Sequence, residues 1–138
     1  MTVEESRASR YEDGRKQSYA TFRARVEAAF DALTDLVADL RNDRPASGEA
    51  AQRAVGDVRK SLVNDVVPCL VQEVNVAADS VYVRLAEALT AASGLLSSPH
   101  EAKDANSPSM VHLSNRIEEV YVALKLFSHL SGEAIYGR

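Results

Sequence analysis

Apolar residues recur at alternating intervals of three and four positions between Arg15 and about Asn42. This spacing places them on one stripe of an α-helix, with charged residues on the opposite side. The stripe runs for more than three heptads, so the segment is predicted to form a long amphipathic helix that faces a core or a coiled-coil partner. The stripe consists of Tyr19, Phe22, Val26, Ala29, Leu33, Leu36 and Leu40.

Three later segments carry a similar helical pattern. They span residues 47–67, 68–98 and 108–130. Ser47 is a good N-cap for the first of them, while Ser107 and Pro108 form a plausible cap and first residue for the last. Ser131 and Gly132 are predicted to end that last helix. Because no segment alternates as a strand does, the sequence predicts an all-α fold, an antiparallel helical bundle of about four helices.

The distribution of large apolar residues predicts which parts of the chain belong to the folded domain. Residues 1–14 are charged and poor in large apolar groups, so we expect a flexible N-terminal tail that Gly14 ends. Residues 15–138 are predicted to form a single helical-bundle domain. The stretch 97–108 is polar and bounded by proline, so a surface loop is expected there.

Pro68 separates two apolar stripes that a straight helix would place on different sides. One stripe lies in 47–67, and the other consists of Leu70, Val74, Ala77, Val81, Leu85, Ala88, Ala92 and Leu95. Proline removes a backbone donor and clashes with the preceding turn, so we predict a break or sharp kink at Pro68 that lets both stripes face one core. The competing interpretation is one long kinked helix.

Charge and composition exclude some classes of protein. The formal net charge is −4 and the isoelectric point is about 5.4, so no nucleic-acid partner is expected. No run has the length and hydrophobicity of a membrane span, and the polar N-terminus lacks the apolar core of a signal peptide. With a single cysteine, no intrachain disulfide can form, so we expect a cytoplasmic protein. The excess of Arg over Lys is typical of a GC-rich bacterial genome.

No cluster of residues carries a convincing catalytic, cofactor-binding or metal-binding pattern. His129 and Glu133 share a helix face, but a metal site needs further ligands from other helices. His112 lacks the surroundings of a phosphorylated histidine. Cys69 follows Pro68, yet no histidine partner can be assigned to it. We therefore predict that the protein is not an enzyme and holds no cofactor or metal.

Extra apolar residues lie away from the main stripes of the last two helices. A contiguous second stripe on two helices indicates burial by another surface, although a helix enclosed by its own bundle would give the same pattern. The candidate interface residues are Cys69, Val76, Val83, Val122, Leu126 and Leu130.

Arg84 lies at the border of the main stripe on 68–98. One interpretation is that its stem covers the core edge while its guanidinium stays in water. The other is an ion pair with a carboxylate along the same border, for which Glu73 and Glu87 are the candidates in this chain.

These patterns leave three hypotheses about function. The first is a non-enzymatic interaction or assembly protein that self-associates, as a homo-oligomer such as a dimer, through the extra apolar stripes. The alternative is a small acidic inhibitor or immunity-type protein that covers a basic site on a protein partner with Asp31, Asp35 and Asp39. The third is a ligand-binding bundle.

Overall fold

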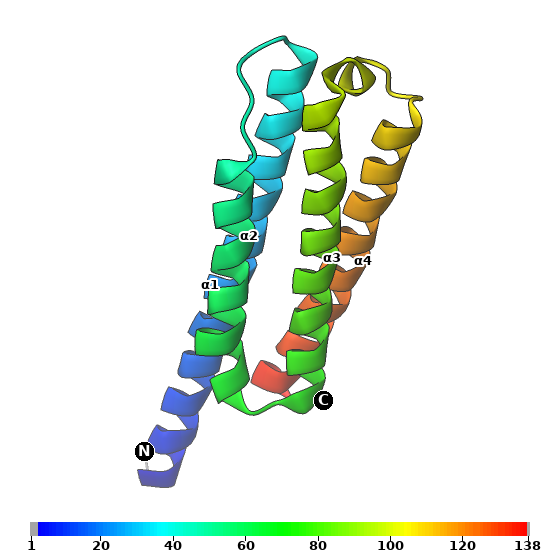
Figure 1. The fold of residues 1–138 in the computed structure, drawn as a ribbon. Helices are drawn as coiled ribbons and strands as arrows, with labels where there is room; N and C mark the ends of the chain where they lie inside the picture. The colour runs from blue at the N-terminus through cyan, green and yellow to red at the C-terminus, as the bar shows by residue number, and fades with distance from the viewer. Residues whose placement is uncertain (1–2, 138) are drawn as a thin grey trace.

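The protein is an antiparallel bundle of four long α-helices (Figure 1). The structure is a computed structural model that describes residues 3–137, with side chains described at residue 10 and at 12–137. Its elements are α1 (Val3–Arg41), α2 (Glu49–Ser61), a π-helical turn (Leu62–Val66), a 3-10 turn (Val67–Cys69), α3 (Gln72–Ser97), a second 3-10 turn (Pro99–Lys103) and α4 (Pro108–Tyr136). Within the described residues there is no strand, which confirms the predicted fold class.

The helices pack as two antiparallel pairs, α1 with α2 and α3 with α4. Figure 1 shows the α1–α2 and α3–α4 connections at one end of the bundle and the α2–α3 connection at the other. None of the helices in the described part of the chain is long and apolar enough to cross a membrane.

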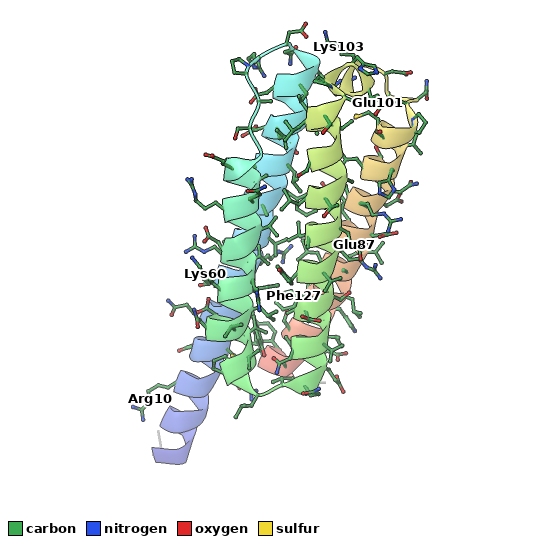
Figure 2. The ribbon with its side chains drawn as sticks, viewed as in Figure 1. Arg10, Lys60, Glu87, Glu101, Lys103 and Phe127 are labelled. Carbon is green, nitrogen blue, oxygen red and sulfur yellow. The ribbon has the colours of Figure 1, made fainter. Side chains whose placement is uncertain are left out.

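The core lies along the predicted stripes. All seven stripe residues of α1 are buried. Phe127 of α4 fills the space between helices (Figure 2), where its ring centroid lies 4.9 Å from that of Phe22 and 5.9 Å from that of Tyr19. Burial of each large apolar side chain stabilises the fold by roughly 1.5–3 kcal/mol, so these aromatic contacts help to hold α1 against α4.

α1 begins at Val3 and not near Arg15. Gly14 lies inside the helix, and the side chains of Arg10, Glu12 and Asp13 are exposed. Figure 1 shows this end of α1 extending beyond the other helices. The sequence pattern missed these turns because residues 3–14 carry no stripe of large apolar residues. That residues 1–14 detach as a flexible tail stays a prediction.

The helical structure is interrupted just after Pro68, as predicted, and α3 begins at Gln72. The interpretation as one long kinked helix is therefore wrong. Leu70 adopts a left-handed backbone with φ 59°, and its N–H donates to the carbonyl of Val67 at 3.0 Å. This reversal takes Leu70 out of phase with α3, so it is 79% exposed. Its predicted place on the main stripe is therefore wrong, whereas Val74 and the later stripe residues of α3 are buried.

Three predicted boundaries differ from the structure. α2 begins at Glu49, whose N–H donates to Ser47 Oγ at 3.3 Å, so Ser47 lies one residue before the cap position. The loop 97–108 contains the 3-10 turn Pro99–Lys103, whose Ala102 is fully buried. α4 continues through Ser131 and Gly132 to Tyr136 because the last turns still pack against the core, with Ser131 itself buried. The predicted start of α4 is confirmed: Ser107 Oγ accepts from the N–H of Met110 at 3.2 Å.

Candidate functional site

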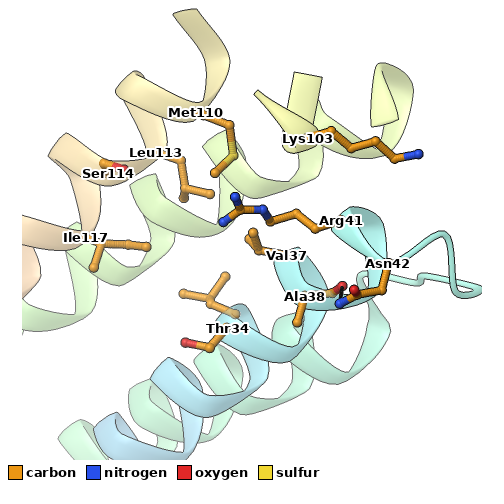
Figure 3. Close-up of a pocket in the computed structure, with 11 residues that line it drawn as sticks. Thr34, Val37, Ala38, Arg41, Asn42, Lys103, Met110, Leu113, Ser114 and Ile117 are labelled. Carbon is orange, nitrogen blue, oxygen red and sulfur yellow. Dashed lines mark hydrogen bonds between the residues drawn. The ribbon is translucent and has the colours of Figure 1, made fainter. Parts of the chain in front are cut away.

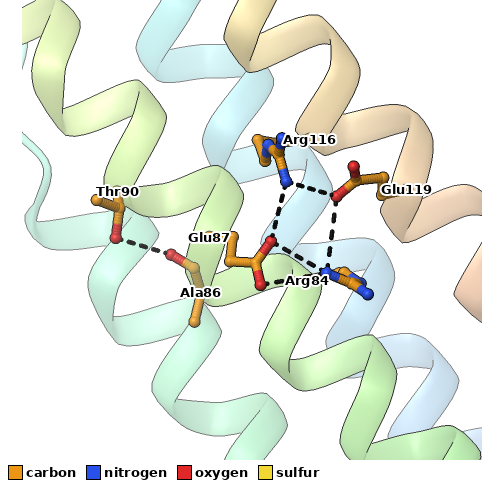
Figure 4. A network of polar contacts seen from close by, with 6 residues as sticks. All are labelled: Arg84, Ala86, Glu87, Thr90, Arg116 and Glu119. Carbon is orange, nitrogen blue, oxygen red and sulfur yellow. Dashed lines mark hydrogen bonds and ion pairs between the residues drawn. The ribbon is translucent and has the colours of Figure 1, made fainter.

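Arg84 belongs to a cluster of four charged side chains that joins the outer sides of α3 and α4 (Figure 4). Arg84 Nη1 lies 3.3 Å from both carboxylate oxygens of Glu87 and 3.9 Å from Glu119 Oε2. Arg116 Nη1 lies 3.3 Å from Glu87 Oε2 and 3.0 Å from Glu119 Oε2. We refer to these residues as the ion-pair cluster. Glu87 was one of the two partners expected for Arg84, while Arg116 and Glu119 were missed.

The ion-pair cluster is only partly shielded from water. Its side chains are 30–42% exposed, so solvent weakens the attraction between them. Each cation nevertheless contacts both carboxylates, and each carboxylate contacts both cations. The cluster therefore has no net charge, and it links the two helices side by side.

A groove of about 580 Å³ lies beside the ion-pair cluster. Arg84 and Ser80 of α3 line one side of it, and Val122 and Leu126 of α4 line the other. Val122 is 65% exposed and Leu126 is 52% exposed, so the groove is bordered by apolar side chains that the bundle itself does not cover.

Val76 and Val83 extend this apolar border along α3. They lie four residues before and three residues after Ser80, spacings that place all three on one side of a helix. Val76 is 59% exposed and Val83 is 41% exposed. We call Val76, Val83, Val122 and Leu126 the apolar patch, and it lies on the face opposite the buried stripe of α3.

Two of the six predicted interface residues do not belong to the apolar patch. Cys69 is only 8% exposed and lies in the core, where its Sγ donates to the carbonyl of Asp65 at 3.4 Å. It precedes the reversal at Leu70 and so follows the phase of α2, which makes its assignment to the interface wrong. Leu130 is partly buried and packs against the core.

The titratable residues considered for chemistry are dispersed. His129 Nε2 lies 3.2 Å from Glu133 Oε1, one turn away on the same helix. His112 is on the exposed side of α4. Across the part of the chain that the structure describes, no group of three or more His, Cys, Asp or Glu side chains is placed to hold a metal ion.

The acidic side of α1 is not a uniform acidic surface. Asp31 and Asp35 are exposed, but Asp39 pairs with Arg44 at 2.8 Å. Asp31 also shares a groove with Arg23 and Lys125. Neighbouring cations therefore cancel part of the negative charge on this side of α1.

The chain matches no protein-family model, no curated protein and no solved structure. Its function must therefore be inferred from the chemistry of its own surfaces.

Proposed function

We propose that this protein is a non-enzymatic assembly module that pairs with a second copy of itself through the outer face of α3 and α4. The observation that carries the proposal is the apolar patch: Val122 and Leu126 of α4 line the groove beside the ion-pair cluster, and Val76 and Val83 are exposed on the outer side of α3. Contiguous exposed apolar side chains on two adjacent helices are typical of surfaces that another protein covers.

The charges beside the patch favour a copy of the same chain. The ion-pair cluster contributes two cations and two anions, all paired with one another. Under a twofold axis each surface meets itself, so a face with a large net charge would repel its copy. A neutral face avoids this repulsion, and its arginines can also bind the partner's glutamates.

The outer face of α3 is long enough to carry a dimer interface. α3 has 26 residues, which corresponds to a helix about 39 Å long. A stable interface covers roughly 800 Å² on each partner, more than four side chains provide. The polar neighbours of the patch, among them Ser80, Asn115 and Thr90, would supply the rim.

Sedimentation velocity of the wild type and of Val83→Glu, over about 1 to 100 micromolar, tests the proposal. We expect a dimer for the wild type and at least about a tenfold increase in its dissociation constant for the variant, because the twofold axis brings two unpaired carboxylates together. Val63→Glu is the matched control, since Val63 is an exposed valine on the π-helical turn and not on the patch. Unchanged helical circular dichroism would show that all three chains are folded.

A wild-type protein that stays monomeric over this range would contradict the proposal, as would equal weakening by Val63→Glu. In the monomeric case the acidic side of α1, with its exposed Asp31 and Asp35, becomes the better candidate for contact with a different, basic protein. From the net charge of −4 we propose protein partners and no nucleic acid, and from the single cysteine we propose a cytoplasmic location.

A further inference from the structure

A second groove runs between the C-terminal half of α1 and the N-terminal half of α4 (Figure 3). Its volume is about 680 Å³. Leu33, Met110 and Leu113 line it with side chains that are otherwise buried, and Val37 and Ile117 border it as partly buried neighbours. The floor of the groove is thus apolar, and the polar side chains of Thr34, Arg41, Asn42, Lys103 and Ser114 complete its lining.

Two cations line this groove: Lys103, which pairs with Asp43, and Arg41, in the last turn of α1. Figure 3 shows its guanidinium extending over the apolar lining, between Val37 and the side chains of Met110 and Leu113. Arg41 is exposed, so an incoming molecule can reach its guanidinium beside the apolar carbon of the lining. It is the kind of polar group that orients a ligand within an apolar site.

The carboxylates near Arg41 are engaged by other residues. Asp39 Oδ1 lies 2.8 Å from Arg44 Nε, and Asp43 Oδ1 lies 2.5 Å from Lys103 Nζ. Glu101, on the neighbouring 3-10 turn, accepts a hydrogen bond from Ser109. Arg41 itself makes no hydrogen bond or ion pair with a side chain in the described part of the chain. Its guanidinium is therefore available to an external anion.

We propose that this groove binds a small amphiphile with an apolar chain and a single carboxylate head group. The chain would lie along Val37, Ile117 and Met110, and the carboxylate would accept hydrogen bonds from the guanidinium of Arg41. This site is on the α1–α4 side, whereas the self-association surface is on α3 and the opposite side of α4. The two proposals can therefore fail independently.

The dimensions of the groove favour a small molecule over a peptide or a second protein. Its volume lies within the range of about 300–1,000 Å³ that is typical of small-molecule sites. A carboxylate also matches the planar fork of a guanidinium, which can donate two parallel hydrogen bonds to it.

Binding can be followed at one atom inside the groove. The chain has two methionines, Met1 and Met110, so methionine labelled with ¹³C at its methyl group gives few signals, and Met110→Leu assigns the one in the groove. Octanoate is the probe, and 1-octanol is its neutral counterpart with the same chain. We expect octanoate to shift the Met110 methyl signal in a saturable manner.

Variants of Arg41 test the role of the guanidinium. Arg41→Gln should weaken octanoate binding by about tenfold or more and leave octanol binding unchanged, because only the charged hydrogen bonds are lost. Arg41→Lys should lie between the two, since it keeps the charge without the fork. Arg53→Gln is the matched control, because Arg53 is an exposed arginine on α2.

Filling the groove tests its location. Thr34 borders the groove with an exposed side chain, so Thr34→Trp should occupy the space without disturbing the core and abolish binding of both probes. The proposal is overturned if octanoate gives no saturable shift up to about 10 millimolar. It is also overturned if Arg41→Gln and Arg53→Gln have equal effects, or if Thr34→Trp binds octanoate as the wild type does.

Discussion

Arg116 of α4 places its Nη1 3.3 Å from Glu87 Oε2 of α3, 29 residues earlier in the chain. This contact crosses between the two helices, whereas the pairs Arg84–Glu87 and Arg116–Glu119 each lie within one helix. Together with the longer Arg84–Glu119 contact of 3.9 Å, it joins α3 to α4 through the ion-pair cluster.

We expect the Glu87–Arg116 contact to contribute little to stability. Both side chains are about one third exposed, and the buried Nε of Arg116 has no hydrogen-bond partner, which offsets part of the attraction. A double-mutant cycle of Glu87→Gln and Arg116→Met should give a coupling free energy below about 1 kcal/mol by urea unfolding. The coupling should fall further in 1 M salt, where the screening length is about 3 Å. A coupling above about 2 kcal/mol would show that the cluster holds the helices together.

Leu33 should be one of the most sensitive positions in the core. It is almost completely buried, so Leu33→Ala should lower the free energy of unfolding by roughly 2–5 kcal/mol through lost burial and a residual cavity. Leu126→Ala removes the same atoms from an exposed site, and should cost less than about 0.5 kcal/mol in dilute protein, where a dimer has dissociated. Similar costs for the two changes would contradict the assigned core.

Leu70 should be replaceable with a gain in stability. Its φ of 59° disfavours a residue with a β-carbon by roughly 1–2 kcal/mol, and its exposed side chain contributes little burial. After allowance for the greater freedom of glycine in the unfolded chain, Leu70→Gly should raise the free energy of unfolding by up to about 1 kcal/mol. Val63→Gly, at an exposed site in the π-helical turn, should instead lower it. A loss of stability in Leu70→Gly would show that the Leu70 side chain makes a stabilising contact.

Removal of residues 1–14 should change the free energy of unfolding by less than about 1 kcal/mol. The exposed Arg10, Glu12 and Asp13 add nothing to the core. The helical circular dichroism should fall, because Val3 to Gly14 are helical in the intact protein. A large drop in melting temperature would show that these turns are docked.

The parts of the fold that depend only on residues close to one another in the sequence could be predicted. The stripe of α1 needs only the helical period, and the cap at Ser107 needs only the three residues after it. The end of α4 could not be predicted this way, since packing of its last turns overrides the stop signal at Ser131 and Gly132.

The candidate sites could be predicted only in part for the same reason. The exposure of Val76, Val83, Val122 and Leu126 could be predicted because the period of a helix shows which side opposes the core. Arg116 and Glu119 join Arg84 only because α4 lies beside α3, and Arg41 meets Met110 only because α1 lies beside α4. Such contacts depend on which helices are neighbours, and the period of a single helix does not contain that information.

The π-helical turn Leu62–Val66 has a consequence for the length of the gene. Its i→i+5 hydrogen bonding accommodates one residue more than an α-helical turn. Val58 in the preceding turn of α2 and Val66 at the end of the π-helical turn are fully buried, whereas Val63 and Asn64 within it are exposed. Deletion of the single codon for Asn64 would therefore leave an ordinary helix with the core residues still in phase. We expect a homologous chain that is one residue shorter to carry its deletion in the π-helical turn and not within α3 or α4.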